Sequence, residues 1–307
     1  MRKILLTLLM VATSAIADTP ISLVIPYAPG GAADSVAKVA QQTIAKSTNR
    51  TVVLEYKPGA GGDIATQYVA NAPKDKLVLM LHTINLPINA SIKTPSYNIS
   101  ELVPLINFGT MPLILVTGEK SKFTTIKEFK NISSATPINF GSSGIFSVSH
   151  LAGEILKQKT NKNLAHVPYQ GQSKTIVDII SGNLDMSFLH PDVALPQINA
   201  NRLIPIAVTT TSRMSTLPNV PTFKESGVGG LELTGYFILI SNKTDDPTEY
   251  KMIQDSVANA LNNPNEIMPY TAVQLEPVKT HVLPESFLIT ETVKFKELFK
   301  KLNLEIK

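Results

Sequence analysis

The chain alternates apolar β-type runs with segments of helical period, and this alternation constrains its fold more than any other feature. Its first third shows three strand-like runs and two helix-like runs between them: residues 21–27, 51–56 and 76–83, with residues 34–46 and 63–72. Repeated strand and helix units form largely parallel sheets that are covered by helices. We therefore predict an α/β fold.

A second series of the same kind follows further along the chain. It predicts strands at residues 138–143, 165–169, 184–190 and 203–211, and helices at residues 147–159, at residues 173–182 and after Pro191. A chain of 307 residues commonly divides into units of about 100 to 200 residues. Two series in a chain of this length indicate two lobes.

The last third predicts elements that are too few to complete the second lobe alone. They are a strand, a helix, a strand and a final helix at residues 231–241, 248–261, 272–278 and 284–302. We assign them to the first lobe. Lobe 1 then comprises residues 18–105 and 225–307, and lobe 2 comprises residues 106–224. Two chain crossings, near Leu105 and near Lys224, would form a hinge with a ligand cleft between the lobes.

The first 17 residues have the pattern of a secretory signal peptide, since Arg2 and Lys3 precede a short apolar run with a small-residue end. We expect a soluble mature chain that begins at Asp18 and resides in the periplasm. The absence of cysteine excludes disulfides and a lipid-bearing amino terminus. Removal of the peptide leaves 26 basic and 24 acidic residues, a balance of +2 that disfavours a nucleic-acid partner. Nothing in the sequence requires more than a monomer.

Two glycine-rich corners each join a predicted strand to a predicted helix. We call residues 27–34 the first corner and residues 57–65 the second corner. Their glycines and acids are Gly30, Gly31 and Asp34 in the first corner and Gly59, Gly61, Gly62 and Asp63 in the second. The start of a helix exposes unpaired N–H groups, so such corners bind anions. Each could also be an ordinary turn with the acid as a helix cap, but the duplication favours an anion site.

Several other kinds of site are excluded or disfavoured. The second corner has Ile64 where a dinucleotide motif needs its last glycine, and no G-K-[ST] motif follows any glycine-rich stretch. Neither corner contains arginine, which suits a carboxylate that must be released. The histidines are scattered, and no HExxH spacing occurs, so we expect no metal and no cofactor.

The second lobe carries candidate ligand residues at its own predicted strand ends, in residues 141–150 and 167–173. His150 lies in the first turn of a helix, off its apolar face, where it either points into the cleft or is solvated. A serine hydrolase that uses Ser142 or Ser143 with His150 is a remote alternative. Its motif is incomplete because Ile145 stands where a glycine is needed.

The residues of both corners, together with "GSSGIFSVSHLAGEIL", "HVPYQGQSKTIVDIISGNLDMSF" and "LIPIAVTTTSRMSTLPNVPTFKESGV", occur in an order that closely resembles the periplasmic receptors of tripartite tricarboxylate transporters, the Bug receptors. The resemblance covers nearly the whole mature chain. It implies a type II periplasmic-binding-protein fold that closes on a small organic acid and delivers it to a permease of one large and one small membrane subunit. It does not name the acid.

The resemblance also implies which residues bind the ligand. A carboxylate would be held by the first lobe, and second-lobe loops would set specificity. The first-lobe residues are Tyr27, Pro29, Gly30, Gly31, Asp34, Gly59, Ala60, Gly61 and Gly62, to which we add Thr83 and Asn85. The second-lobe residues are Ser142, Ser143, Ser147, His150, Tyr169 and Gly171.

The sequence departs from the family pattern in several places. Leu189 occupies a position that is often acidic, which argues against an amino-acid ligand, with Asp192 as a possible substitute nearby. Residues 265–274 look shortened or rewritten. Two further binding functions stay open, namely a receptor that reports to a membrane sensor and a receptor of an ABC importer for another anion.

Overall fold

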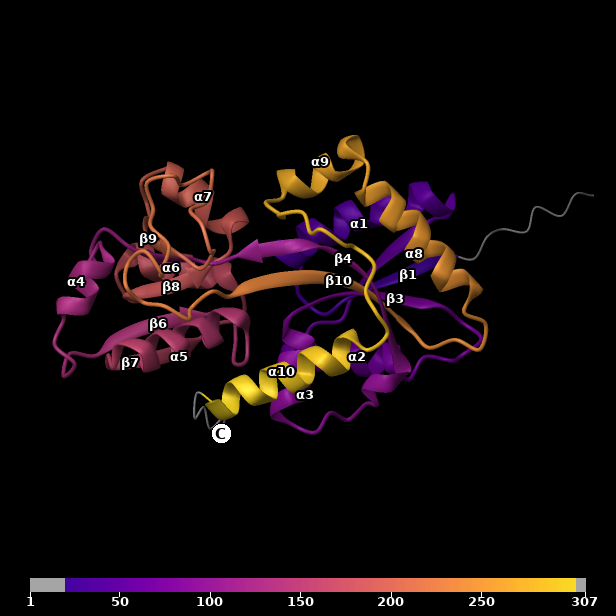
Figure 1. The fold of residues 1–307 in the computed structure, drawn as a ribbon, viewed down its shortest axis with the longest axis horizontal. Coiled ribbons are helices and arrows are strands. Elements are labelled where there is room, and N and C mark those ends of the chain that lie inside the picture. The colour runs from indigo at the N-terminus through magenta and orange to yellow at the C-terminus, as the bar shows by residue number, and fades with distance from the viewer. Residues whose placement is uncertain (1–19, 302–307) are drawn as a thin grey trace, which may run out of the picture.

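The computed structural model describes residues 20–301, so the predicted signal peptide of residues 1–17 lies outside the described residues. The chain forms two five-stranded sheets that lie side by side and are covered by helices (Figure 1). We call each sheet with its helices a lobe. The predicted α/β fold with two lobes is confirmed.

The two sheets share one topology, with strand order β2-β1-β3-β10-β4 in the first and β7-β6-β8-β5-β9 in the second. One strand in each sheet, β10 in the first and β5 in the second, runs antiparallel to both of its neighbours. The first sheet contains β1 (Ile21–Ile25), β2 (Val52–Tyr56), β3 (Val78–Thr83), β4 (Leu102–Pro112) and β10 (Thr234–Asn242). The second contains β5 (Ile114–Thr117), β6 (Ile138–Ser142), β7 (Leu164–Pro168), β8 (Met186–Leu189) and β9 (Ile204–Val208).

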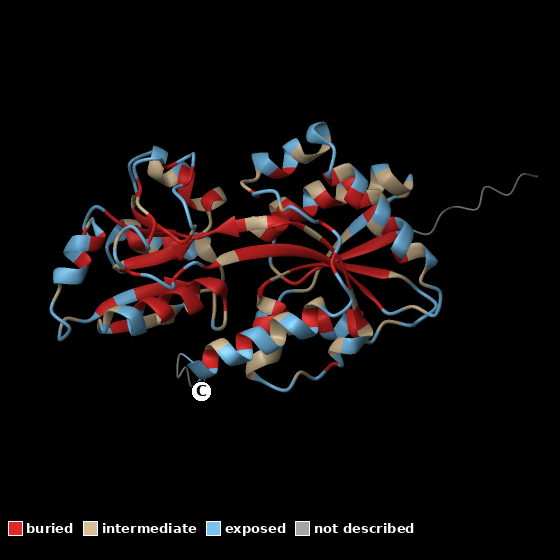
Figure 2. Ribbon diagram, in the orientation of Figure 1, coloured by how far each residue is buried: buried red, intermediate tan, exposed pale blue. Residues whose placement is uncertain are grey.

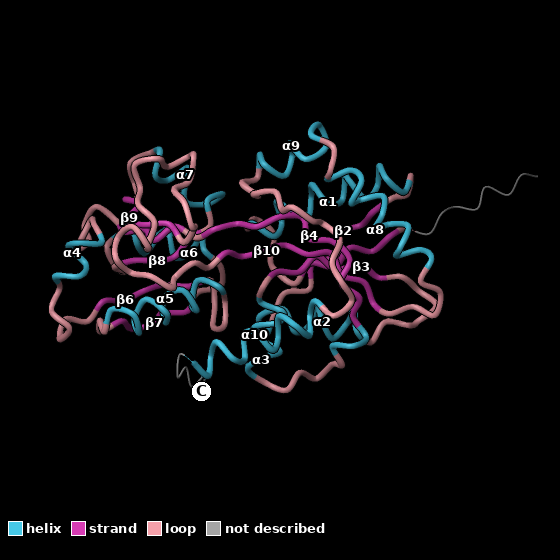
Figure 3. The backbone as a smooth tube through the Cα atoms, in the orientation of Figure 1, coloured by secondary structure: helices cyan, strands magenta, loops and turns pink. Residues whose placement is uncertain are grey.

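Helices cover both sheets, and their inner faces are buried while their outer faces are exposed (Figure 2). Loops and turns join the elements mostly around the outside of each lobe (Figure 3). The first-lobe helices are α1 (Ala32–Thr48), α2 (Asp63–Ala70), α3 (Asn85–Ile92), α8 (Thr248–Leu261), α9 (Pro264–Ala272) and α10 (Phe287–Lys301), with short 3-10 turns η1 (Ala60–Gly62) and η2 (Ile99–Glu101). The second-lobe helices are α4 (Ile126–Asn131), α5 (Val148–Thr160), α6 (Gln172–Ser181) and α7 (Pro191–Asn199).

Helix α1 shows how the sequence produces this arrangement. Its residues Val36, Ala40 and Ile44 recur at helical spacing, and all three are fully buried against the first sheet. Asn49 ends the helix with a left-handed conformation, φ 54°. Burial of an isoleucine such as Ile44 contributes about 1.5 to 3 kcal/mol.

The parallel pairing fixes where the loops meet. Strand β1 is parallel to β2 and β3, and β6 is parallel to β7 and β8. The carboxyl ends of three neighbouring strands therefore lie at one edge of each sheet. In sheets of this kind that edge is where ligands bind.

Two chain segments join the lobes, and Thr209 ties them together. The first is Leu113, between β4 and β5, and the second comprises residues 209–233. The Thr209 hydroxyl accepts from Leu113 N–H at 2.9 Å and donates to Leu233 O at 2.6 Å. Strand β4 pairs with β10 along residues 102–112, so it extends past the lobe limit of residue 105 expected from the sequence. The lobe limits themselves stay a prediction.

The carboxyl-terminal third departs from one expectation. The strand predicted at residues 272–278 is wrong, because this region makes only a single antiparallel bridge between Thr110 and Glu276. Helix α9 begins before it, and Tyr270 from this helix stacks on Phe108 at 5.4 Å and donates to Thr43 Oγ1 at 2.8 Å. This contact holds residues 265–274, the segment whose sequence departs from the family pattern, against the first lobe.

Candidate ligand-binding site

The first corner is held in shape by Asp34, which is nearly fully buried. Its Oδ2 accepts from Gly30 N–H and from the Lys38 ammonium, both at 2.9 Å, and its Oδ1 accepts from the Tyr56 hydroxyl at 2.6 Å. Burial alone would raise the Asp34 pKa, but these hydrogen bonds outweigh it and leave the pKa below its ordinary value. Both carboxylate oxygens are thus engaged within the first lobe.

The other side of the first corner is open. A Cβ built on Gly30 or on Gly31 would have no described heavy atom within 4 Å, apart from its own chain neighbours. Helix α1 begins directly after Gly31, and the first N–H groups of a helix have no intrahelical acceptor. The corner therefore presents backbone donors and a helix amino terminus to an unfilled space.

The second corner is shaped mainly by packing. Gly59, Ala60, Gly61 and Gly62 all have positive φ, at 134°, 49°, 67° and 106°. A Cβ on Gly61 would lie 3.0 Å from Asn89 Nδ2, and the Asn89 amide donates to Gly61 O at 3.0 Å. Backbone conformation and close contact therefore account for these glycines within the first lobe itself.

The acids of the two corners are both paired with lysines of the same lobe. Asp34 pairs with Lys38 at 2.9 Å, and Asp63 forms an ion pair with Lys93. An unpaired carboxylate at either helix start would repel an anionic ligand. The pairing offsets that repulsion and leaves the helix N–H dipoles to act on the ligand.

The ends of β1 and β3 are joined beside the first corner. The Tyr27 hydroxyl lies 2.6 Å from Thr83 Oγ1, which also accepts from Asn85 N–H at 3.3 Å. Burial raises the pKa of Tyr27 to about 12, so its hydroxyl stays protonated. Asn85 Oδ1 is buried and has no hydrogen-bond partner among residues 20–301, which makes it a free acceptor next to the corner.

His82 was not singled out by the sequence, yet it lies beneath the second corner. It is buried at 1% exposure, and its Nδ1 accepts from Thr83 N–H at 2.8 Å. Its Nε2 faces Gly62 and has no hydrogen-bond partner in the described chain. Burial lowers the pKa of His82 to about 4. His82 lies within an apolar strand, so the sequence around it did not indicate a functional role.

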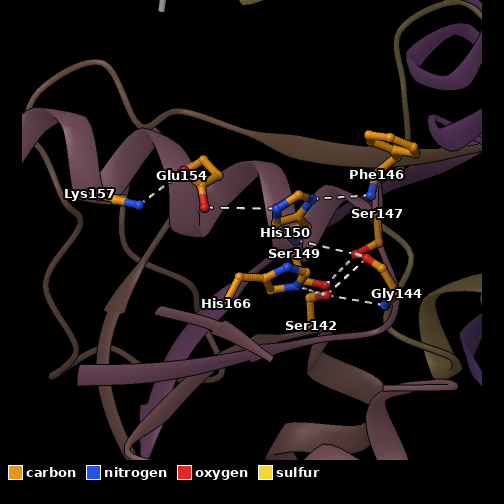
Figure 4. A network of polar contacts seen from close by, with 9 residues as sticks. All are labelled: Ser142, Gly144, Phe146, Ser147, Ser149, His150, Glu154, Lys157 and His166. Carbon is orange, nitrogen blue, oxygen red and sulfur yellow. Dashed lines mark hydrogen bonds and ion pairs between the residues drawn. The ribbon is translucent and has the colours of Figure 1, made fainter. Parts of the chain in front are cut away.

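In the second lobe, the residues from Ser142 to Ser147, which we call the serine loop, form a network of polar contacts (Figure 4). Ser147 caps helix α5, and Ser142 is fully buried. Ser143 N–H donates to Ser149 Oγ at 3.1 Å, and Ser147 Oγ donates to Gly144 O at 2.7 Å. The serine hydroxyls predicted to face a ligand are thus engaged mainly with one another and with the loop backbone.

His150 takes part in this network and is not a solvated side chain. Its ring stacks on that of His166, with centroids 3.8 Å apart and planes 17° apart. His166 Nε2 lies 2.6 Å from Ser142 Oγ. The serine–histidine contact of this region is therefore made by His166, and the predicted partner His150 bonds to neither Ser142 nor Ser143 through its ring. The buried Ser142 does not match the exposed nucleophile that a hydrolase needs.

The remaining second-lobe candidates occupy different positions. Gly171 has φ 105° and no described heavy atom within 4 Å of a built Cβ, so it borders open space as Gly31 does. Tyr169 donates to Asp178 Oδ2 at 2.6 Å and is tied to its own lobe. Burial raises the pKa of Asp192 to about 6, and its Oδ1 has no partner among residues 20–301. Leu189 is fully buried in the second-lobe core and does not present a side chain to a ligand.

The two halves of the candidate site approach each other across β10. Phe237 pairs in register with Thr83, and its ring lies 6.4 Å from that of His190. His190 N–H donates to Gln172 Oε1 at 3.0 Å, next to Gly171. The strand ends of one lobe thus stand close to those of the other, beside the two crossings.

The similarity of the chain to known proteins shows its family. The model of the family described as "Tripartite tricarboxylate transporter family receptor" matches residues 36–304. The chain belongs to this family. Among its relatives, Protein BugT of Bordetella pertussis (strain Tohama I) is 27% identical over 278 residues, which are 87% of this chain and 85% of BugT.

Solved structures of similar fold include the periplasmic binding protein BugD. It superposes with a TM-score of 0.81 at 26% identity and covers 94% of this chain and 99% of its own. The structure described as "R. palustris Rpa4515 with adipate" has a TM-score of 0.84 at 22% identity, covering 93% of this chain and 98% of its own. This tripartite tricarboxylate transporter receptor therefore has the periplasmic-binding-protein fold that its sequence predicted. Within residues 20–301, no helix has the length and apolarity to cross a membrane.

Proposed function

We propose that this receptor binds a small organic carboxylate between its two lobes in the periplasm and delivers it to a membrane transporter of one large and one small subunit. The observation that carries the proposal is the open face of the first corner. There, Gly30 and Gly31 leave space beside the start of α1, at the carboxyl end of β1, in a member of this receptor family.

The ligand class follows from the donors that surround this space. A carboxylate needs hydrogen-bond donors and no competing negative charge, and the corner offers backbone N–H groups while Asp34 is bound internally. No arginine lies in either corner, so the carboxylate would be held by neutral dipoles, which permits release. The neighbour with adipate supports this class, as adipate is a dicarboxylate.

The two lobes would act as a clamp. The first-lobe residues that the sequence predicts as ligand contacts would bind the acid first. Gly171 and the serine loop would add contacts when the lobes close. Ligand binding then shifts the population toward the closed form, which the transporter recognises. The proposal keeps the lobe limits predicted from the sequence, residues 18–105 and 225–307 for lobe 1 and residues 106–224 for lobe 2, with the end of β4 crossing the limit within the first sheet. The receptor acts as a monomer after removal of residues 1–17.

The test is a melting-temperature panel on the mature chain with dicarboxylates, tricarboxylates, aromatic acids, amino acids and inorganic anions. A ligand at 100 times its Kd adds roughly 2.7 kcal/mol of stability, a shift that is easily measured. The chain has no tryptophan, so an external dye or calorimetry must report the transition. Stabilisation by one class of carboxylate is expected, and a flat response in ligand-free protein would contradict the proposal.

A further inference from the structure

Helix α5 begins with a cap in which a histidine takes a role usually held by glutamate. Ser147 is the N-cap residue, and its Oγ accepts from His150 N–H at 3.3 Å. In return, His150 Nδ1 accepts from Phe146 N–H at 3.1 Å. In the common capping box, a Glu or Gln side chain reaches back to the N-cap N–H. In this cap the N-cap N–H of Ser147 donates to Gly144 O at 3.2 Å, and the side chain of the third helical residue bonds to the N–H one residue earlier. Here the acceptor is an imidazole nitrogen, which loses its acceptor capacity when it is protonated.

The residue that this hydrogen bond holds has a strained backbone. Phe146 has φ 65°, a left-handed conformation that bulky residues rarely adopt. Such a conformation persists only where the surroundings enforce it, and it concentrates at ligand-binding positions. The His150 ring supplies that enforcement from the first turn of α5 (Figure 4).

A second histidine supports the first from beneath. His166, on β7, stacks on His150 at 3.8 Å and lies 2.6 Å from Ser142 Oγ, which also accepts from Gly144 N–H at 3.2 Å. One ring thus anchors the start of the serine loop and the other anchors its end. The stack makes the position of each ring depend on the other.

The two rings are surrounded by an aromatic ring on one side and by an ion pair on α5. Strand β6 contributes the apolar Phe140 ring, 5.0 Å from His166, and β7 contributes His166 itself. On α5, Glu154 Oε1 lies 3.8 Å from His150 Nε2, and Lys157 lies 3.9 Å from the other Glu154 oxygen. Burial lowers the pKa of His150 to about 4, with smaller contributions from repulsion by a protonated His166 and by Lys157, and burial lowers the pKa of His166 to about 4. Both rings are therefore neutral at pH 7.

We propose that His150 and His166 are positioning residues that fix the shape in which residues 143–147 meet the ligand, and that neither imidazole contacts the ligand. The ligand part of this inference rests on the proposed function. It revises the sequence-based assignment of His150 as a ligand contact, because Nδ1 already accepts from Phe146 N–H and the other ring nitrogen, Nε2, lies 3.8 Å from Glu154 Oε1 of the same helix. It also gives His166, which the sequence did not single out, a role in the same loop.

Two variants of His150 separate positioning from ligand contact. His150→Leu removes the acceptor but keeps an apolar side chain, and we expect hydrogen exchange at residues 143–147 to become about fivefold faster or more, since a lost helix cap has an effect of that size. His150→Gln keeps a side-chain acceptor at this position, within reach of Phe146 N–H, and should keep the loop protected. Binding of adipate, used as the probe, should weaken in His150→Leu and stay near the wild-type level in His150→Gln.

The pH dependence of hydrogen exchange at residues 143–147 provides a second test. It would not change if the His150 ring acted only by filling space. Between about pH 7.5 and about pH 4, the wild-type loop should lose protection after correction for intrinsic exchange rates, as protonation removes the Nδ1 acceptor. His150→Gln, which has no titratable group at this position, should keep its protection. The matched control is Glu128→Leu, which removes the third-position acceptor of the Thr125 capping box on α4 in the same lobe. It should leave residues 143–147 unchanged.

Two results would overturn the inference. One is unchanged exchange at residues 143–147 in His150→Leu. The other is loss of adipate binding in His150→Gln while the loop stays protected, which would make the imidazole itself the ligand contact. If the wild-type chain binds no carboxylate at all, the proposed function fails, whereas the exchange measurements still decide the positioning role.

Discussion

A Cβ on Gly62 would lie 2.7 Å from Nε2 of His82, so the second corner and strand β3 approach each other too closely for any side chain at this position. Gly62 also has φ 106°, which other residues rarely adopt. The contact brings the start of α2 against the end of β3. Two separate constraints, one of space and one of conformation, therefore act on the same glycine.

Gly62→Ala should lower the free energy of unfolding by about 1 to 3 kcal/mol, because the added Cβ meets both constraints. His82→Ala in the same chain removes the ring that the new Cβ would strike but leaves the strain in φ. The double variant should then show a coupling of about 1 kcal/mol in a urea-unfolding cycle. Gly229→Ala, at a position with open space and no positive φ, is the control. Additive effects would show that Gly62 and His82 do not constrain each other.

Gly31→Val should remove ligand binding while leaving the fold intact. Gly31 has φ −108° and ψ 179°, an extended conformation that valine adopts readily, and a built Cβ meets no described atom within 4 Å. The valine side chain would therefore fill the space that we assign to the carboxylate. We expect the melting temperature of the unliganded chain to change little and the ligand-induced shift to disappear.

Gly229→Val is the matched control for this prediction as well, because Gly229 also has open space around its Cβ position. It introduces the same side chain away from the first corner and should retain the full ligand-induced shift. A Gly31→Val variant that is still stabilised by the same carboxylates would place the ligand elsewhere.

The sequence correctly predicted elements in which the spacing of apolar residues within the element itself indicates a helix or a strand. Helix α8 spans Thr248–Leu261 as expected, since its apolar positions Tyr250, Ile253 and Val257 recur at helical spacing and are buried. Helix α9 was missed. Pro269 lies inside the helix, where proline argues against helical structure, and the position of α9 depends on the contact of Tyr270 with Phe108, a residue far away in the chain.

In the candidate site, too, features with a local sequence pattern could be predicted, whereas contacts between distant residues could not. The two corners could be located because each lies between a strand pattern and a helix pattern. The partners of their side chains could not be predicted, because they come from distant parts of the chain. Tyr56 bonds to Asp34 across 22 residues, and His166 reaches Ser142 across 24 residues, with no local signal for either contact. Sequence reasoning therefore located the corners and loops of the candidate site, but it could not predict which of their side chains are used in hydrogen bonds within each lobe.

Tyr270→Phe should lower the free energy of unfolding by about 1 kcal/mol. The change removes the hydroxyl that donates to Thr43 Oγ1 in a buried setting and keeps the stack on Phe108. Tyr270→Ala should cost about 3 to 5 kcal/mol, because it also removes a fully buried ring. Urea unfolding measures both values. Equal costs for the two variants would mean that the stack with Phe108 contributes nothing to holding α9.

The stability of the receptor should fall steeply in acid, because several histidines are buried in the neutral form. Burial lowers the pKa of His82 and of His190 to about 4, against an ordinary value of 6.5. Between these two pH values the unfolded chain binds more protons than the folded chain, so the free energy of unfolding rises with pH. The stabilisation is complete above about pH 6.5 and is lost progressively as the pH falls toward about 4.

A fully buried histidine contributes a slope of up to about 1.4 kcal/mol per pH unit in that window, which applies to His82. His190 is partly exposed and contributes less. His150 and His166 are less buried and add a smaller part, since solvent screens them. Urea-unfolding midpoints measured across the window provide the test. His190→Gln should reduce the slope of the free energy of unfolding against pH by the contribution of this one histidine. A free energy of unfolding that stays constant across this range would show that these rings are protonated, or exposed, in the folded receptor.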